Sequence, residues 1–309
     1  MISKVTFTPA MSGASAVTLH DPATSTTRFL SKADGLVGPP APRDVTRVRP
    51  GVDGIVDQSS YLGERSITLE GELWGATGGA SLADLSTISE AFSSTMLSPG
   101  RLEWTLENGD VRWCNCKLAG GIETSIEGAS RLVQYQVQLR ASDPRVYKGP
   151  YATAKNSVSL PLTPITFDGT LYYTLGPTAA TNLVNAGTAP SPPVLTIKGP
   201  TSAGLVDYLN VTVTPPSAYS SLAQGGSSIV FAWDTAATSE ITLSGAIATI
   251  DVASRSFTVN SGSWLVSPSA ASEFALLYPG TSTASWTTRT LVSGYTGAEC
   301  KFEWFDAYW

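Results

Sequence analysis

Hydrophobic and polar residues alternate along much of the chain with a period of two, which is typical of β-strands that are buried on one side. In Arg131–Arg140, valine, tyrosine and leucine on one side alternate with Gln134, Gln136, Gln138 and Arg140 on the other. Glutamine keeps an exposed strand face soluble without adding charge. The same three glutamines would also suit lateral contact with another subunit, so we treat them as candidate interface residues.

Similar patterns predict the other strands in the first half of the chain. Two of these strands flank Asn108-Gly109, and Asn-Gly between such runs is the strongest short signal for a β-hairpin. The predicted strands are Met1–Thr8, Ala16–His20, Ser66–Trp74, Arg101–Leu106 and Val111–Leu118.

One segment, Ser81–Met96, has helical spacing instead. Its apolar residues recur at steps of three and four, which predicts an amphipathic helix that packs on the sheet. Ser81 with Asp84 resembles a capping box, and Pro99-Gly100 would end the helix. The apolar stripe consists of Leu82, Leu85, Ile88, Phe92 and Met96.

Residues 31–61 show no regular pattern, because glycine and proline interrupt any long element. An irregular stretch of this length inside a compact domain usually has a function. Arg43, Arg47 and Arg49 make it basic within an acidic chain. A solvated surface loop would explain these arginines. The alternative is an arm that reaches an acidic neighbouring subunit, because the arginine fork suits interface carboxylates.

Short strands at roughly ten-residue spacing, separated by turn residues, fill the second half of the chain and favour a β-sandwich. We place the domain boundary at Lys148-Gly149-Pro150, which gives domains of residues 1–147 and 148–309. The predicted strands of the second domain are Val158–Leu162, Ile165–Thr174, Leu209–Val213, Ser228–Trp233, Glu240–Leu243, Ala248–Asp251, Ser256–Val259, Glu273–Leu277 and the aromatic chain end Cys300–Trp309.

The segment Asn182–Gly199 has a further pattern of its own. A turn at Asn185 and Gly187 is followed by a proline-rich run, in which each proline ring fixes φ and disfavours helix. Val194, Leu195 and Ile197 then form a short β-rich run. The pattern predicts a chain that leaves a hairpin, crosses a surface in extended form and enters a sandwich strand.

Composition narrows the possible functions. The 309 residues carry a net charge of −6, so neither binding along a nucleic-acid backbone nor sequence-specific nucleic-acid recognition is expected. Few charges and many glycines and prolines indicate a mainly β protein rich in turns.

No apolar run approaches the roughly 20 residues of a membrane span, and the N-terminus lacks the apolar core of a signal peptide. We therefore expect a protein made in a cytoplasm, with no membrane partner.

Residues suited to catalysis or metal binding are sparse. His20 is the only histidine, so the chain has few of the side chains that form a catalytic triad or a four-ligand zinc site. Cys114 and Cys116 stand two apart on a predicted strand, so both side chains point to one face and do not easily bridge each other. With Cys300 they form no disulfide framework. We expect no metal and no cofactor.

An enzymatic role is not expected either. The chain contains no Gly-x-Ser-x-Gly elbow and no phosphate-binding loop. Glu70 and Glu72 lie side by side on the polar side of a predicted strand. They fit solvent or interface groups better than the carboxylate pair of a glycosidase.

Several passages resemble the distal tail proteins of siphophages. The order of strands, arm, strand, helix, hairpin and last strand, with the motifs Tyr61–Arg65 and Asp143–Tyr147, is similar to the N-terminal ring domain of that family. Asn182–Gly199, Ala248–Trp264 and Ser272–Ser282 resemble its C-terminal, galectin-like domain. Ser282 stands where the family commonly has asparagine, which is a departure from the pattern.

The resemblance implies an N-terminal β-sandwich or split barrel with one helix, followed by a galectin-like β-sandwich. It also implies a structural virion protein that forms a hexameric ring between the tail tube and the tail-tip hub or baseplate. The implied partners are further copies of the chain, the tail tube protein and a tail-tip hub or tail-associated protein. The implied location is the tail tip of the virion, after assembly in the host cytoplasm.

The alternative function is a carbohydrate-binding adhesin that recognises the host cell wall. A galectin-like sandwich could stack sugars on exposed tryptophans, whereas buried tryptophans would belong to the core. Trp233, Trp286 and Trp304 lie on or near predicted strands. Trp264 lies in a predicted loop, which makes it the candidate glycan contact.

Overall fold

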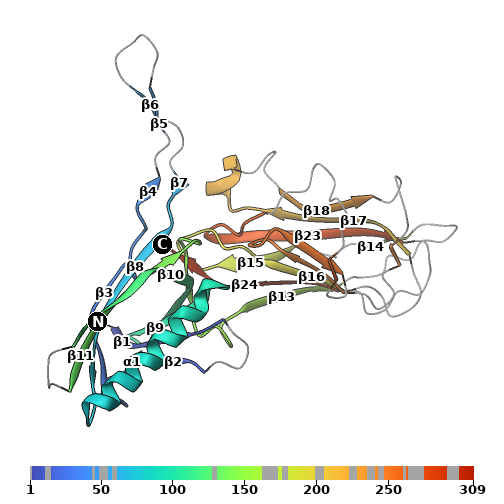
Figure 1. Cartoon of the computed structure of the whole chain (residues 1–309). Coiled ribbons are helices and arrows are strands. Elements are labelled where there is room, and N and C mark those ends of the chain that lie inside the picture. Colours follow the sequence, from blue (N-terminus) through green and yellow to red (C-terminus); the bar gives the residue numbers. More distant parts are fainter. Residues whose placement is uncertain are drawn as a thin grey trace. The chain divides into compact units, whose positions relative to one another are not determined.

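The computed structural model divides the chain into two compact units, and Figure 1 labels the helix α1 and most of the strands. Unit 1 contains Met1–Thr153 with Tyr308–Trp309, and unit 2 contains Ala154–Ala307. The structure describes residues 2–10, 15–43, 46–48, 55–57, 61–126, 131–161, 173–175, 180–198, 205–222, 228–234, 241–242, 247–259, 262–263, 275–290 and 299–309.

Unit 1 is built on an antiparallel sheet whose strands follow the order β2-β1-β9-β10-β11-β8-β3. The long strand β10 pairs with β9 through residues 111–116 and with β11 through residues 117–126, so it joins the two parts of the sheet. The register shifts between Leu118 and Ile122, where Gly120 and Gly121 lie. The bounds are β1 Ile2–Thr8, β2 Val17–His20, β3 Arg28–Asp34, β8 Arg65–Trp74, β9 Gly100–Leu106, β10 Val111–Ile126 and β11 Leu132–Ala141, with β12 Val146–Lys148 paired to β10.

The alternation read from the sequence is confirmed in these strands. On β11 the side chains of Val133, Tyr135, Val137 and Leu139 are buried, and the residues between them face outward. The predicted hairpin is also confirmed, because Gly109 has φ of +84° in the turn between β9 and β10. The core lies between the two parts of the sheet and includes Phe7, Leu19, Leu69, Phe92, Leu102, Trp104, Cys114 and Cys116.

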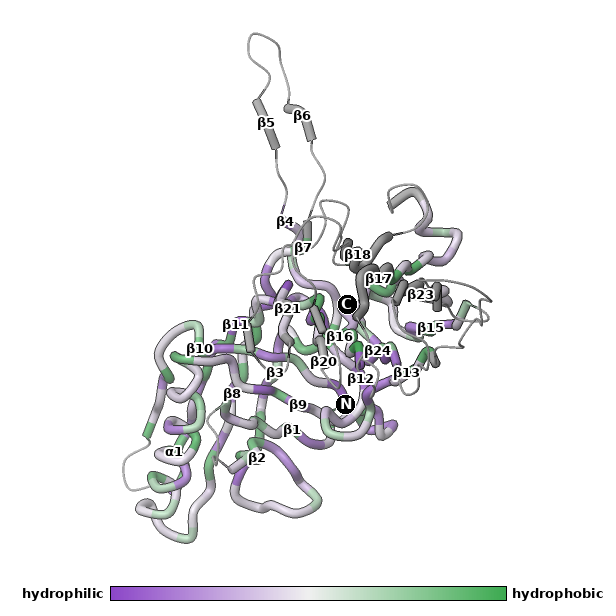
Figure 2. The backbone as a smooth tube through the Cα atoms, turned by 90° about the vertical axis from the view of Figure 1, so that its right-hand side faces the viewer, coloured by the Kyte–Doolittle hydropathy of each residue, from purple (hydrophilic) through white to green (hydrophobic). Residues whose placement is uncertain are grey.

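The helix α1 spans Gly78–Ser93, three residues earlier than predicted, and is followed by the 3-10 turn η1, Ser94–Met96. Figure 2 shows hydrophobic positions on α1 interleaved with paler and hydrophilic ones. Ile88, Ala91 and Phe92 are buried and Leu85 packs beside the core. Leu82 and Met96 are 46% and 78% exposed, so their assignment to the buried stripe was wrong. At the start of the helix the buried position is Ser81, next to Leu82, and at the end it is Thr95, next to Met96.

The arm is more regular than predicted. Ser31 to Asp34 belong to the edge strand β3, which pairs with β8. Beyond it β4 (Pro42–Arg43) pairs with β7 (Tyr61–Leu62), and β5 (Thr46–Val48) pairs with β6 (Ile55–Asp57). These two short ladders follow one another along an antiparallel ribbon (Figure 1). For the described residues of this segment, the prediction of irregular structure was therefore wrong, because their backbones pair in strands despite the neighbouring glycines and prolines.

Unit 2 contains two six-stranded antiparallel sheets that enclose one core, as in a β-sandwich. One sheet has the order β13-β24-β16-β20-β21-β22, and the other has β14-β23-β17-β18 with β15 beside β23 and β19 beside β17. The bounds are β13 Asn156–Pro161, β14 Tyr173–Leu175, β15 Thr181–Asn185, β16 Val194–Lys198, β17 Leu205–Thr214, β18 Ser228–Asp234, β19 Ile241–Thr242, β20 Ile247–Asp251, β21 Ser256–Val259, β22 Gly262–Ser263, β23 Gly280–Thr290 and β24 Glu299–Trp304, with the 3-10 turn η2 at Ser217–Leu222. The last strand, β25 (Ala307–Tyr308), pairs with β12 in the sheet of unit 1.

In the segment from Asn182 to Gly199, the predicted turn and the strand entered at Val194 are confirmed as far as Lys198, where the described part ends. The predicted hairpin before the turn was wrong, because β15 pairs with β23, which comes much later in the chain. The Asn185 side chain accepts a hydrogen bond from the Gly187 N–H at 3.0 Å and donates to the carbonyls of Ala189 and Leu277, both at 2.8 Å. The proline-rich run then leads into β16. Asn185 is buried, so this side chain fixes the turn from inside the unit.

The predicted strand Glu273–Leu277, with its end at Pro279-Gly280, was wrong. Residues 275–277 form only an isolated bridge, Ser191 with Leu277, and Gly280 begins strand β23 rather than ending one. Gly280 has φ of +103°, which suits a chain that turns sharply into a strand. The predicted strand Ile165–Thr174 falls mostly outside the described residues.

Candidate assembly surface

The outer face of β3, β8, β11 and β10 is a polar surface. Register places Gln134 opposite Glu72 and Gln136 opposite both Glu70 and Glu123. Directly paired residues of antiparallel strands point to the same face. These five side chains therefore share the face that points away from the core.

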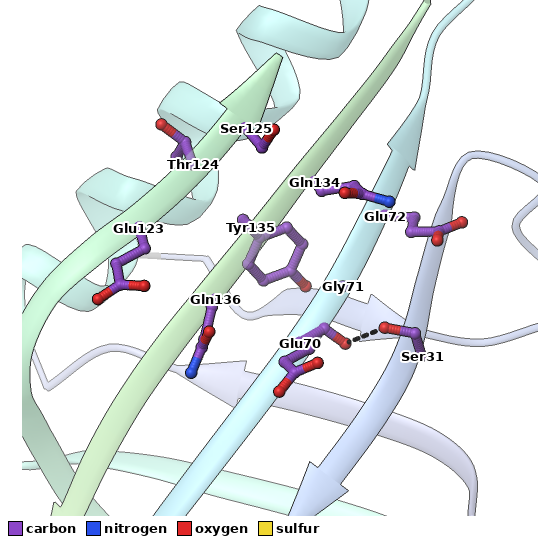
Figure 3. A pocket seen from close by; sticks show the side chains of 10 residues that line it. All are labelled: Ser31, Glu70, Gly71, Glu72, Glu123, Thr124, Ser125, Gln134, Tyr135 and Gln136. Atoms are coloured by element: carbon purple, nitrogen blue, oxygen red, sulfur yellow. Dashed lines mark hydrogen bonds between the residues drawn. The ribbon is translucent and has the colours of Figure 1, made fainter. Parts of the chain in front are cut away.

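A shallow pocket of about 320 Å³ lies on this face (Figure 3). Three carboxylates line it, Glu70, Glu72 and Glu123. Lys32 contacts Glu70 at 3.3 Å and Asp34 at 3.0 Å, and hydrogen bonds to these two carboxylates raise the pKa of Lys32. The full lining is Ser31, Glu70, Gly71, Glu72, Glu123, Thr124, Ser125, Gln134, Tyr135 and Gln136. The surface is thus acidic and suited to hydrogen-bonded contacts.

The predicted interface residues separate into two places. Gln134 and Gln136 line the pocket, whereas Gln138 is exposed opposite Thr68 on the same face. Arg43 is exposed on β4, in the ribbon and not on the sheet that carries the glutamines. The backbone of Arg47 belongs to β5, and Arg49 lies outside the described residues. Among the described residues, Arg43 and the glutamines therefore lie in different sheets.

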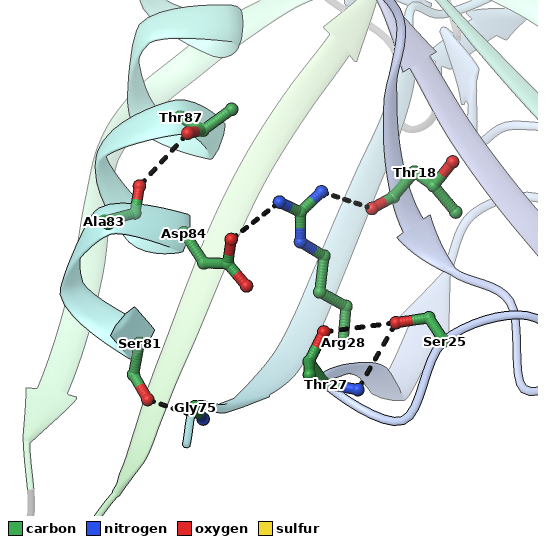
Figure 4. A network of polar contacts seen from close by, with 9 residues as sticks. All are labelled: Thr18, Ser25, Thr27, Arg28, Gly75, Ser81, Ala83, Asp84 and Thr87. Atoms are coloured by element: carbon green, nitrogen blue, oxygen red, sulfur yellow. Dashed lines mark hydrogen bonds and ion pairs between the residues drawn. The ribbon is translucent and has the colours of Figure 1, made fainter. Parts of the chain in front are cut away.

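The opposite side of this sheet is fixed by α1 and a polar network (Figure 4). Arg28 on β3 donates to the carboxylate of Asp84 at 2.8 Å and to the carbonyl of Thr18 at 3.2 Å. Ser81 is buried, donates to the carbonyl of Arg131 at 2.5 Å and accepts from the Gly75 N–H at 2.8 Å. Asp84 and Ser81 thus bind the helix to the sheet.

The predicted capping box at Ser81 was wrong. The N-cap of α1 is Thr77, whose hydroxyl accepts a hydrogen bond from the Ala80 N–H at 3.2 Å. A threonine that precedes a helix is a recognised cap signal. Here it is followed by Gly78 and Gly79, and because glycine is a poor helix former, the sequence pattern does not indicate that the helix begins there.

Sequence reasoning missed the role of Arg65, at the base of the arm. Its side chain is 2% exposed and donates to the carbonyl of Gly35 at 2.8 Å and to that of Pro144 at 3.0 Å. Burial lowers its pKa. Tyr147 donates to Asp143 at 2.6 Å, which orders the same turn. The family-like motifs Tyr61–Arg65 and Asp143–Tyr147 are therefore joined directly, through Arg65.

The three cysteines and the histidine of unit 1 and unit 2 are each held in buried or partly buried surroundings. All three cysteines are buried free thiols. A hydrogen bond with Cys114 and burial raise the pKa of Cys116, and burial raises that of Cys300. His20 accepts a hydrogen bond from the Leu30 N–H at 3.3 Å, and burial lowers its pKa. Among the described residues, no group of three or more His, Cys, Asp or Glu could hold a metal ion.

The tryptophans of unit 2 are distributed as follows. Trp286 and Trp304 are 2% and 3% exposed and belong to the core, and the Trp304 indole donates to the carbonyl of Val184 at 3.1 Å. Of Trp233 only the backbone, in β18, is described. Trp264, the predicted glycan contact, lies outside the described residues.

In the part of the chain that the structure describes, no helix is long and apolar enough to cross a membrane.

Comparison with solved structures identifies the class of fold. The chain is similar to the Dit protein of phage SPP1, described as a paradigm of the hub adsorption apparatus in phages that infect Gram-positive bacteria. The likeness has a TM-score of 0.58 at 12% sequence identity and covers 93% of this chain and 98% of that one. The chain thus shares the fold of that protein.

Two further similar structures are the baseplates of phage p2 in the activated conformation with Sr and with Ca. Their chains match at TM-scores of 0.49 and 0.47, with 10% and 9% identity. The matches cover 97% of both chains in the first case and 98% of both in the second. No protein-family model matches the chain, and no curated protein sequence matches it.

Proposed function

We propose that the chain is a siphophage distal tail protein, a structural ring component that connects the tail tube to the tail-tip hub. The observation that carries this proposal is the likeness to SPP1 Dit, which extends over 93% of this chain and so includes both units. The family-like motifs joined by Arg65 support it independently of that comparison. The protein would act in the virion, at the tail tip, after assembly in the host cytoplasm.

Two surfaces of unit 1 are suited to ring formation. The outer face with Gln134, Gln136 and Gln138 offers hydrogen-bonding groups, and the ribbon offers an exposed arginine, Arg43. The ribbon arginines of one copy would contact carboxylates of the next, because the chain as a whole is acidic. Six copies would close the ring, by resemblance to the family. The tail tube protein and a hub or tail-associated protein would bind its two sides.

This role is structural, and the proposal includes no catalysis. The carbohydrate-binding alternative receives no support from Trp286 or Trp304, because buried indoles cannot stack on a sugar. Unit 2 would serve as a galectin-like scaffold on the ring.

Light scattering coupled to size-exclusion chromatography tests the ring. The purified chain, alone or with tail tube protein, is expected to form a species of about six times the monomer mass of 32.3 kDa. A monomer at every accessible concentration, also in the presence of the tube protein, would refute ring formation.

A further inference from the structure

A second cavity of unit 1, which we call the Trp104 pocket, combines apolar walls with buried hydrogen-bond donors. Its volume is about 130 Å³. Leu36, Leu106 and Val146 form apolar walls, and Val37 lines it with a side chain that is 76% exposed. The pocket is therefore reached from solvent at an apolar rim.

Two donors in this pocket have no acceptor among the described residues. Trp104 on β9 and Arg112 on β10 are direct cross-strand partners, so their side chains lie next to each other on one face. Trp104 is 1% exposed, and neither its indole Nε1–H nor the buried Nη1 of Arg112 meets an acceptor. Buried donors of this kind are rare, because the loss of hydration is not offset.

The guanidinium of Arg112 is held in a fixed orientation. Its Cζ lies 3.8 Å from the centroid of the Tyr308 ring, and Tyr308 also lines the pocket. Its Nη2 faces the carboxylate of Asp110 at 3.5 Å, which is long for a charged hydrogen bond. The contact with Asp110 is thus weak, and the buried Nη1 keeps a fixed position without an acceptor.

We propose that the Trp104 pocket binds an aspartate or glutamate side chain, flanked by an apolar residue, from a segment of a partner protein. The unmet groups are donors only, and the two oxygens of one carboxylate can accept from both Trp104 and Arg112. The apolar flanking residue would pack on Val37. The proposal goes beyond ring formation and does not depend on it.

Calorimetric titration of the full chain with two matched peptides tests this inference. The probes are acetyl-Leu-Glu-Leu-amide and acetyl-Leu-Gln-Leu-amide, which differ in the carboxylate alone. The glutamate peptide is expected to bind saturably and at least about tenfold more tightly than the glutamine peptide. Absence of binding by the glutamate peptide, or equal affinity for both, would overturn the proposal.

Variants locate the binding to the pocket. Arg112→Gln is expected to weaken the glutamate peptide about tenfold or more. Because Arg112 is partly buried, Val37→Asp provides a second variant whose exposed position leaves folding intact and whose charge repels the ligand. Leu97→Asp is the matched control, since Leu97 is 88% exposed and does not line the pocket. Binding that survives Val37→Asp, or is lost equally in Leu97→Asp, would contradict the assignment.

Discussion

Tyr135 packs its ring over Gly71, its direct partner on the neighbouring strand. A Cβ at residue 71 would overlap the Tyr135 ring, so the glycine is required for the aromatic side chain to lie flat in the core. Gly71→Ala is therefore expected to lower the free energy of unfolding by about 1–3 kcal/mol through overpacking. Denaturant midpoints measure the loss.

Gly120→Ala is the matched control for this substitution. Gly120 also lies in a strand of unit 1, but a Cβ there would meet no atom within 4 Å. Its midpoint is expected to change little, within about 0.5 kcal/mol. Equal losses in the two variants would show that the close approach of Tyr135 is not what excludes a side chain at residue 71.

Arg65 is expected to determine how firmly the base of the arm is attached. Arg65→Lys keeps the charge but not the fork that reaches both Gly35 and Pro144, so unfolding should become about 1.5–3 kcal/mol easier. Arg140→Lys is the control, because Arg140 is exposed and its ion pair with Glu64, at 3.5 Å, lies in solvent. Thermal denaturation of both variants checks the difference, and an equally small effect in both would contradict the role of Arg65.

Most strands of unit 1 could be predicted because each has one buried and one solvated face. Arg131–Arg140 alternates almost without exception, and the Asn108-Gly109 turn uses the positive φ that glycine allows. The edge strand β3 lacks this signal, because none of its side chains is fully buried. Its pairing with β8 is a tertiary property that the local sequence does not encode.

The candidate surface could be predicted only in part. Alternation placed Gln134 and Gln136 on an outer face, but Glu123 joins them through a pairing that follows the irregular register of β10. The role of Ser81, on the other side of the sheet, could not be predicted from the local sequence either. Its spacing to Asp84 imitates a capping box, whereas its actual partners are the backbone of Gly75 and Arg131.

The ribbon arginines are expected to stabilise the ring rather than the fold. Replacing Arg43, Arg47 and Arg49 together by alanine should shift the assembly equilibrium towards monomer, while the unfolding midpoint changes by less than about 0.5 kcal/mol. Raised salt should weaken the wild-type ring in the same direction, since exposed charges are screened.

Arg131→Ala, an exposed arginine outside the ribbon, serves as the control for this triple variant. Sedimentation velocity measures the monomer fraction of each. A triple variant that forms the ring as well as the wild type, at low and at raised salt, would refute the contact.

The three cysteines are expected to be unreactive in the native chain. All are buried, and the pKa values of Cys116 and Cys300 are raised, so the thiolate form that alkylating reagents attack is depleted at pH 8. Iodoacetamide followed by mass spectrometry should modify none before unfolding and all three in denaturant. Rapid modification of one thiol in the native chain would contradict this burial.

The central claim is that the chain lies at the distal end of a phage tail. Immunogold electron microscopy of intact particles that carry the chain, with antibodies raised against the whole protein, tests this most directly. The account predicts gold at the junction between the tail tube and the tail tip. Label confined to the capsid or spread along the tube would contradict it.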